Sequence, residues 1–482
     1  MAGIVSPLDR YKSTSQLQCE QSTLPMAMAV DHTTHVLLLP YPTQGHINPL
    51  LQFGKRLAAR RGVRSTIAVT RFVHRSTTPS PGQVHLAAIS DGCDHAGYDE
   101  AGDARAYLAR LESAGSETLG ELLRAEAELG RPVHVVVYDS FLPWALGVAR
   151  RHGAACAAFL TQACAVNIAY GHAWAGTVSL PVTQPPRHLP GLPPDLEVSD
   201  LPTFMVNPAD GHGYQDILVK AQFDGLAEAD DVLVNSFSEL EPPEAEYLAS
   251  TWGAKTIGPT VPSAYLDNHI PDDTSYGCHL HQPSPATTTW LDARAACSVV
   301  YAAFGSVATA SPEQMAEVAE GLLATGKPFL WVVRASEAAK IPGDFAGKLA
   351  AAGGRGLVVS WSTQLEVLAH PAVGCFVTHC GWNSTVEGIS AGVPMVAMPR
   401  WSDQAMNAKY IADVWRVGAR PRRGSDGVVG RGEVERCIRE VMEREEYRRN
   451  AAKWRDMARA AMSKGGSSDA NVVAFIAKHG AK

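Results

Sequence analysis

The chain has 482 residues, of which 46% are hydrophobic and 19% are charged. It is long enough for two or three domains with full-sized cores, and its composition is not that of a disordered protein. A formal net charge of −7 without a long basic run argues against nucleic acid or an anionic membrane surface as a partner, and no apolar run approaches the ~20 residues that span a bilayer.

The N-terminal segment and the cysteines indicate the compartment. Residues 1–30 are polar and lack the apolar core of a secretory signal. We expect them to form a disordered extension, or to reflect an over-long gene model, and assign them no function. The nine cysteines are scattered singly without a C-x-x-C pair, which is typical of free thiols in a reducing compartment. We therefore predict a cytoplasmic protein, and we expect a monomer.

From about residue 35, short apolar runs alternate with amphipathic stretches. The strands expected in the first half are 35–40, 65–70, 84–89, 133–139, 155–161 and 231–236. Those in the second half are 298–305, 329–334, 357–361, 374–379 and 393–399. Near-continuous apolar runs are typical of strands buried on both faces of a parallel sheet. With helical patterns between them, this order predicts an α/β protein with doubly wound sheets.

A Pro-rich stretch divides the pattern into two Rossmann-like halves. The predicted parts are an N-terminal domain over 31–260, a linker over 261–286 and a C-terminal domain over 287–465. Residues 466–482 are expected to form a helix that can pack back on the N-terminal domain. A second Pro-rich stretch, 181–203, reads as a long surface loop, either the wall of a substrate pocket or an inert excursion.

Ligands of open α/β sheets bind beyond the carboxyl ends of the strands. In the first half, His46 lies in a turn between a strand and a helix, and Asp139 ends a later strand. If both strands run parallel in one sheet, the aspartate can orient the imidazole as a general base. On position alone, a histidine near a helix start and an aspartate in a local turn explain the pattern better. No serine or cysteine occupies a nucleophile elbow.

The second half holds three further candidate strand ends. Trp361 ends a strand and can stack on a nucleobase, with Gln364 near it, although it can also close a core edge. In FVTHCGWNSTVEG, residues 376–388, a strand leads through glycine into a helix start, which is a ready diphosphate site. Ser384 and Glu387 also fit a capping box. Asp403 and Gln404 suit vicinal sugar hydroxyls, or a simple helix cap.

The spacing of these strand ends is specific. The 44 residues from Trp361 to Gln404 resemble the signature box of plant secondary-product UDP-glycosyltransferases at essentially every diagnostic position. The resemblance runs from about residue 35 to the end and includes PYPTQGHINP, VVYDSFLPWA, VLVNSFSELEPP and YAAFGSV. Within the family, the chain is most similar to enzymes that glucosylate plant acids and small phenolics, and to grass enzymes that glucosylate trichothecenes. Ala303 departs from the family, which often has serine there.

The resemblance implies a GT-B fold, in which two facing Rossmann-like domains bind the acceptor and the UDP-sugar. It makes His46 the catalytic base and Asp139 its partner, and it places Phe141 and Gln162 at the acceptor. The implied UDP contacts are Trp361, Ser362 and Gln364 at the base and ribose, Glu387 at the ribose diol, and Ser306, His379, Asn383 and Ser384 at the diphosphate. The implied sugar contacts are Thr161, Trp382, Asp403 and Gln404, and a final glutamine in this box goes with glucose.

We therefore predict an inverting glucosyltransferase that moves glucose from UDP-glucose to a hydroxyl or carboxyl oxygen of a small lipophilic acceptor. Such an acceptor would be a plant metabolite, a hormone acid or a mycotoxin, in secondary metabolism or detoxification. No metal and no other cofactor is expected. Two alternatives remain open: another reaction on the same scaffold, such as epimerisation or hydrolysis, and a non-catalytic UDP-sugar-binding protein.

Overall fold

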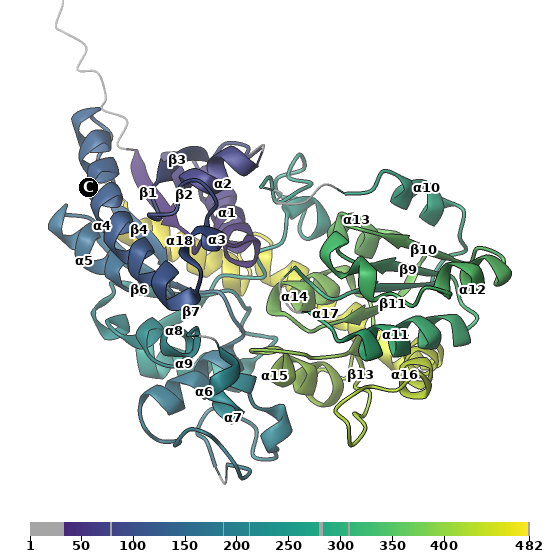
Figure 1. Ribbon diagram of the computed structural model, residues 1–482. Helices are drawn as coiled ribbons and strands as arrows, with labels where there is room; N and C mark the ends of the chain where they lie inside the picture. Colours follow the sequence, from purple (N-terminus) through teal and green to yellow (C-terminus); the bar gives the residue numbers. More distant parts are fainter. Residues whose placement is uncertain are drawn as a thin grey trace, which may run out of the picture. The chain divides into compact units, whose positions relative to one another are not determined.

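A computed structural model describes residues 33–77, 80–186, 188–211, 213–278, 283–306 and 309–480 (Figure 1). The extension predicted over residues 1–30 lies outside the described residues. In the described part, no helix is both long enough and apolar enough to cross a membrane.

The first half forms a seven-stranded parallel sheet in the order β3-β2-β1-β4-β5-β6-β7. Its strands are β1 Thr34–Leu39, β2 Val63–Thr70, β3 His85–Ile89, β4 Val135–Asp139, β5 Ala155–Leu160, β6 Asp231–Val234 and β7 Ala254–Thr256. Its helices are α1 Gln44–Ala58, α2 Arg71–Ser76, α3 Tyr98–Ala101, α4 Ala104–Glu128, α5 Trp144–Arg151, α6 Cys164–Trp174, α7 Thr203–Val206, α8 Gln215–Leu218 and α9 Pro242–Trp252.

The second half forms a six-stranded parallel sheet in the order β10-β9-β8-β11-β12-β13. Its strands are β8 Val299–Ala303, β9 Phe329–Val332, β10 Gly356–Val359, β11 Val373–Thr378, β12 Met395–Ala397 and β13 Gly418–Ala419. The helices are α10 Ala286–Asp292, α11 Pro312–Ala324, α12 Phe345–Ala351, α13 Gln364–Ala369, α14 Trp382–Ala391, α15 Gln404–Lys409, α16 Arg431–Glu443, α17 Glu445–Met462 and α18 Ser467–His479.

The apolar runs form strands because each sheet is covered on both faces. Alternate residues of a strand point to opposite faces. In β1, Val36 and Leu38 pack with residues of α1 and α18, whereas Leu37 and Leu39 belong to the cluster that contains residues of α4, α5 and α6. A strand buried on both faces needs no polar side chain, which is why the sequence shows continuous runs. The predicted doubly wound parallel sheets are confirmed.

Two strands escaped the sequence analysis. β7 has three residues and β13 has two, and each lies at the edge of its sheet. A segment this short shows no periodicity, so its pairing depends on the neighbouring strand that is already in place. The predicted strand that ended at Trp361 was also too long, since β10 stops at Val359.

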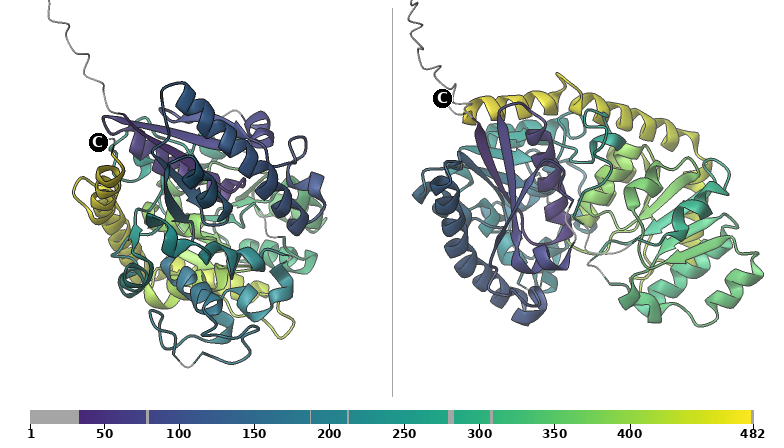
Figure 2. Two further views of the ribbon diagram at one scale, coloured as in Figure 1. Left: turned by 90° about the vertical axis from the view of Figure 1, so that its left-hand side faces the viewer. Right: turned by 90° about the horizontal axis from the view of Figure 1, so that it is seen from above.

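The C-terminal helices connect the two halves. α17 packs against α14 of the second half, and α18 then lies against β7 of the first sheet (Figure 2, yellow). Ser468 Oγ donates to the Gly258 carbonyl at 2.6 Å, and Asn471 Nδ2 donates to the Thr256 carbonyl at 2.8 Å. His479 Nε2 lies 2.7 Å from Asp231 Oδ2. These contacts hold α18 on the first half.

Each sheet has one switch point, where successive strands are added on opposite sides. It falls between β1 and β4 in the first sheet and between β8 and β11 in the second. At such a point the two following loops diverge and leave a crevice at the carboxyl edge of the sheet. His46 and Asp139 border the first crevice, and Ser306 and His379 border the second, because they follow or end these four strands.

Candidate active site

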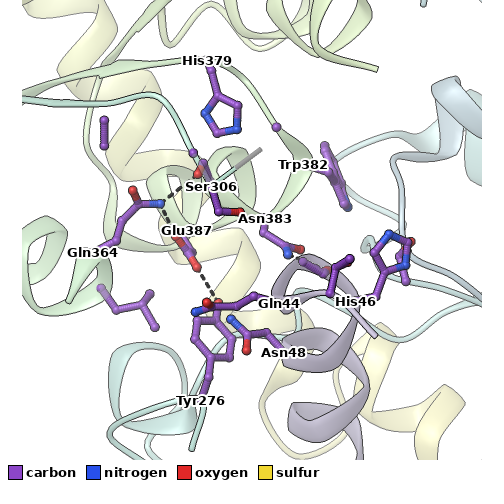
Figure 3. A pocket seen from close by; sticks show the side chains of 18 of the residues that line it. Gln44, His46, Asn48, Tyr276, Ser306, Gln364, His379, Trp382, Asn383 and Glu387 are labelled. Atoms are coloured by element: carbon purple, nitrogen blue, oxygen red, sulfur yellow. Dashed lines mark hydrogen bonds between the residues drawn. The ribbon is translucent and has the colours of Figure 1, made fainter. Parts of the chain in front are cut away.

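Residues of both halves line one cavity of about 530 Å³ (Figure 3). The predicted site residues that line it are His46, Phe141, Thr161, Gln162, Ser306, Trp361, Ser362, Gln364, His379, Trp382, Asn383, Ser384, Glu387, Asp403 and Gln404. Asp139 lies behind His46 and contacts it directly. The structure therefore brings all the predicted site residues to one place.

His46 and Asp139 form a hydrogen-bonded pair. The distance between His46 Nδ1 and Asp139 Oδ2 is 2.7 Å, and the aspartate side chain is fully buried. Asp139 Oδ1 also accepts the backbone N–H of Phe141 at 3.1 Å, which fixes the carboxylate plane. Because a carboxylate only accepts, His46 Nδ1 must donate to it, and the lone pair of the neutral ring is on Nε2. The pair has the arrangement of an oriented general base.

Aromatic rings surround this histidine. The Phe141 ring lies 4.6 Å from the His46 ring, and the Tyr41 ring lies 5.4 Å from it, measured between centroids. Tyr41 in turn donates a hydrogen bond to the hydroxyl of Tyr214, and Tyr214 packs edge-on against Trp401. All four rings line the cavity. This end of the cavity suits a flat or compact apolar molecule that offers one oxygen to His46.

The start of α14 corrects one expectation. The capping box of Ser384 and Glu387 is absent, because Gly381 is the N-cap residue and Ser384 lies inside the first turn of the helix. The N-cap residue, Gly381, has no side chain that could cap the helix. The first backbone N–H groups of a helix have no carbonyl partner within it. This end of α14 lines the cavity through Gly381, Trp382 and Asn383, and it can bind an anion.

His379 fills the space between two glycines. A Cβ atom on Gly305 or on Gly381 would lie 2.5 Å from His379 Nε2, so only glycine leaves room for the ring. Burial, reinforced by the charges of Arg400 and Arg334, lowers the pKa of His379 to about 3. The ring is therefore neutral at pH 7. Within the described part of the chain its Nδ1 atom is buried without a hydrogen-bond partner.

Glu387 is the centre of a polar cluster on the nucleotide side. Gln364 Nε2 donates to Glu387 Oε2 at 2.5 Å and to Ser384 Oγ at 2.8 Å. Tyr276 of the linker donates its hydroxyl to Glu387 Oε1 at 2.7 Å (Figure 3). Tyr301 lies 3.0 Å from Ser362 Oγ and donates to Gln364 Oε1 at 3.2 Å. Burial raises the pKa of Glu387 to about 6, and the bonds from Tyr276 and Gln364 oppose that rise.

The turn after β12 is held in a fixed shape. Gln404 Oε1 accepts the backbone N–H groups of Arg400 and Trp401 at 2.8 and 3.0 Å. Ser402 has a positive φ of 59°, a conformation that costs a non-glycine residue energy. Thr203 of the first half stabilises it, since its hydroxyl accepts the Ser402 N–H at 2.8 Å and its N–H donates to the Ser402 carbonyl at 2.9 Å. Burial raises the pKa of the neighbouring Asp403 to about 6.

Thr203 belongs to the Pro-rich stretch 181–203, for which the sequence predicted either a pocket wall or an inert surface loop. Among the described residues of 181–203, none lines the cavity. The loop instead binds the second half: Arg420 pairs with Asp200 at 2.6 Å, and Lys409 pairs with Asp195 at 3.0 Å. The described part of the loop is therefore neither a wall of this cavity nor an inert excursion, because Thr203 braces the turn that carries Asp403.

Several lining residues were missed by the sequence analysis. Gln44 and Asn48 on α1 point into the cavity, and in the described part Gln44 Oε1 and Asn48 Oδ1 are buried without a hydrogen-bond partner (Figure 3). Tyr276 and Tyr301 were missed as well. Gln44 and Asn48 flank His46 within PYPTQGHINP, so proximity to a candidate base was an available signal. Tyr276 lies in a linker without periodicity and gave none.

The charge around the cavity is unusual for an anion site. Among the described lining residues there is no lysine and no arginine. Two arginines lie behind the residues that line the cavity. Arg334 donates to the Ser306 carbonyl, and the Arg400 guanidinium stacks 4.3 Å above the Phe304 ring. Within the described ranges, no group of three or more His, Cys, Asp or Glu side chains is placed to hold a metal ion. The helix start is thus the nearest positive pole for a bound anion.

Known proteins are similar to this chain in sequence and in fold. A family model described as "UDP-glucoronosyl and UDP-glucosyl transferase" matches residues 249–463. UDP-glucosyltransferase UGT13248 of barley, Hordeum vulgare, is 48% identical over 452 residues, which cover 92% of this chain and 94% of the relative. The chain belongs to the plant family 1 UDP-glycosyltransferases. As a member of this family it is a UDP-dependent glycosyltransferase with a UDP-sugar as co-substrate.

Solved structures of plant UDP-glycosyltransferases agree with this fold. Os79 of rice, Oryza sativa, in complex with UDP, is 47% identical, has a TM-score of 0.87, and is covered over 100% of its chain by 92% of this one. A second structure of Os79 contains UDP and deoxynivalenol-3-glucoside; it is 46% identical with a TM-score of 0.83 and the same coverage. The predicted GT-B fold, with two parallel sheets, is confirmed.

Proposed function

We propose that this UDP-glycosyltransferase moves glucose from UDP-glucose to an oxygen of a small lipophilic acceptor, with inversion at the anomeric carbon. One observation carries the proposal. The same cavity holds an imidazole oriented by a buried carboxylate, His46 with Asp139, and the start of α14, whose N-cap residue is a glycine. A proton acceptor and an anion site in one cavity are what the transfer needs.

In the proposed reaction, His46 Nε2 takes the proton of the acceptor hydroxyl as its oxygen attacks the anomeric carbon. The bond from that carbon to the diphosphate oxygen breaks on the opposite face, so the α-linked sugar becomes β-linked and UDP leaves. Asp139 stabilises the imidazolium that forms, because its buried carboxylate bonds Nδ1 at 2.7 Å. A carboxylic acid acceptor is already ionised at pH 7, so it would depend less on His46.

The UDP would lie across the second half. We assign Trp361 to stacking on the uracil, the Ser362 backbone and Gln364 to the base and ribose, and Glu387 to the ribose diol. The diphosphate contacts proposed for the second crevice are Ser306, His379, Asn383 and Ser384. Neutral His379 would act as a hydrogen-bond donor rather than as a charge, since its pKa is about 3. The charge that develops on UDP would be met by the N-terminus of α14.

The glucose would contact Thr161, Trp382, Asp403 and Gln404. The two lone pairs of Gln404 Oε1 are occupied by backbone N–H groups, so its amide nitrogen is the part that can serve a sugar hydroxyl, as a donor. Asp403 can accept from hydroxyl groups, and its Oδ2 atom already accepts from Asn407 at 2.6 Å. A donor beside an acceptor suits two neighbouring hydroxyls of one sugar.

The acceptor would occupy the aromatic end of the cavity, against Phe141 and Tyr41, with Gln162 as a polar contact. Gln162 Oε1 is buried and lacks a partner in the described part, so it can accept a hydrogen bond from an acceptor hydroxyl. The relatives support this class of acceptor: rice Os79 carries deoxynivalenol-3-glucoside in one structure, and a maize relative is an indole-3-acetate β-glucosyltransferase. We further propose a cytoplasmic monomer that acts in secondary metabolism or detoxification.

The test is His46→Ala, assayed with UDP-glucose and an alcohol acceptor such as a trichothecene. We expect turnover to fall by at least about 10³-fold while UDP-glucose still binds, because only the base is lost. Turnover near that of the wild type would overturn the assignment. Product analysis with UDP-glucose and no acceptor tests the alternatives, since an epimerase or a hydrolase would still consume the donor.

A further inference from the structure

A linker tyrosine occupies a place in the cavity that the proposed function leaves without a role. Tyr276 is 8% exposed and lines the cavity with its phenol ring. Its hydroxyl donates to Glu387 Oε1 at 2.7 Å, while Gln364 donates to the other oxygen, Oε2, at 2.5 Å (Figure 3). Each oxygen of this carboxylate therefore accepts one hydrogen bond from the protein.

The two bonds fix the carboxylate without saturating it. A carboxylate oxygen can accept two hydrogen bonds, so each oxygen of Glu387 keeps one place for a ligand. Two such places side by side match the vicinal 2′- and 3′-hydroxyl groups of a ribose, each of which can donate one bond. A donor on each oxygen sets the rotation of the carboxyl group, which otherwise turns freely about its last torsion.

The backbone beside Tyr276 is anchored to the helix that begins near His46. Lys55 of α1 donates to the Ser275 carbonyl at 2.7 Å, and Gln52 donates to the same carbonyl at 3.3 Å. Lys55 also pairs with Asp273 at 2.7 Å, and both side chains are less than 10% exposed. A buried ion pair holds its two backbones tightly, because breaking it leaves an unpaired buried charge. The position of the Tyr276 hydroxyl is thus set by α1 of the first half.

We propose that Tyr276 is a positioning residue for the nucleotide: its hydroxyl orients the Glu387 carboxylate toward the ribose diol. The linker then completes the nucleotide subsite, and α1 supports both the proposed base and, through Lys55, the group that orients the ribose ligand. This inference rests on the proposed function, since it assumes that the ribose of UDP lies against Glu387.

The experiment measures binding by calorimetry with two probes, UDP and 2′,3′-dideoxyuridine diphosphate. Tyr276→Phe keeps the ring and removes only the hydroxyl. We expect this variant to bind UDP about ten-fold more weakly than the wild type, and to bind the dideoxy probe as the wild type does. Only the loss of a diol-specific contact produces that difference, because damage to the whole pocket weakens both probes equally.

Tyr265→Phe is the matched control, since it removes a phenol hydroxyl from the same linker at a residue that does not line the described cavity. It should bind both probes as the wild type does. Asp273→Asn, which weakens the anchor, should reproduce part of the diol-specific loss. An unchanged or tighter UDP affinity in Tyr276→Phe, or an equal loss for both probes, would overturn the inference. If the wild-type protein bound no UDP, the proposed function itself would fail.

Discussion

The crevices of the two sheets lie at equivalent places but are built from different chemistry. In the first, two side chains meet, His46 and Asp139, and the contact joins residues 93 positions apart. In the second, the backbone N–H groups at the start of α14 face the cavity, and the imidazole of His379 is held neutral. The first crevice is suited to moving a proton, and the second to holding an anion without a cationic side chain.

This difference has a physical cause. A proton acceptor must change its charge during the reaction, so it needs a titratable side chain with a partner that stabilises the charged form. An anion site must keep its character throughout, and backbone N–H groups neither titrate nor move. Changes in the first crevice should therefore alter turnover, and changes in the second should alter donor binding.

Among the changes beyond His46→Ala, the strongest effect is expected for Asp139→Asn. Asparagine keeps the size of the side chain but cannot stabilise an imidazolium, so turnover of an alcohol acceptor should fall by about 10³-fold. Calorimetric titration with UDP should give an unchanged affinity, because the second crevice is untouched. A rate within ten-fold of the wild type would show that the pair does not act as a base.

Gly381→Ala tests the second crevice by adding one methyl group, without changing a charge or a hydrogen-bonding group. The backbone of Gly381 has a negative φ of −59°, which alanine adopts freely, but the new Cβ would lie 2.5 Å from His379 Nε2. The new methyl group should displace the His379 ring or the start of α14. The KM for UDP-glucose should then rise about 100-fold, since a shift of about 1 Å in a binding group can have an effect of this size. Gly343→Ala is the control, because a Cβ there meets no atom within 4 Å. Equal KM values for the two variants would contradict the proposed diphosphate site.

A smaller change should follow Thr203→Val, which removes the hydroxyl that accepts the Ser402 N–H. The turn before Asp403 would lose about 1 kcal/mol of support, and UDP-glucose binding should weaken about five-fold. UDP lacks the sugar, so its affinity should not change. The exposed Thr251 offers a matched control as Thr251→Val. If UDP and UDP-glucose weakened together, the turn would not be specific for the sugar.

The smallest effect is expected from pH. Burial raises the pKa of Glu387 to about 6, so this carboxyl is ionised at pH 7.5 and largely protonated at pH 5.5. Protonation removes an acceptor from the ribose site, and UDP-glucose affinity should therefore fall about four-fold between these pH values. Calorimetry without acceptor measures the affinity for UDP-glucose at both pH values. The same experiment on Glu387→Gln shows how much of the change in affinity other groups cause. An identical pH dependence in that variant would remove Glu387 from the explanation.

Local patterns in the sequence specify the sheets and the frame of the site. Continuous apolar runs are long enough to mark the central strands, and strand ends in a parallel sheet meet at one edge, so His46, Trp361 and Asp403 could be placed from their spacing alone. Their roles rest on the family resemblance and remain proposals. Residues within one strand-turn-helix unit are close in the chain, which is why local patterns reveal them.

Contacts between residues far apart in the chain depend on the tertiary structure. Tyr276 reaches Glu387 across 111 positions, and Thr203 reaches Ser402 across 199. Neither contact leaves a periodic signal, because each depends on how a linker and a Pro-rich loop are anchored to the other half. The absent capping box has the same cause: Ser384 and Glu387 had the right spacing, but α14 begins at Trp382 and Glu387 bonds side chains from elsewhere in the fold. A local pattern can be satisfied by several structures, and packing selects among them.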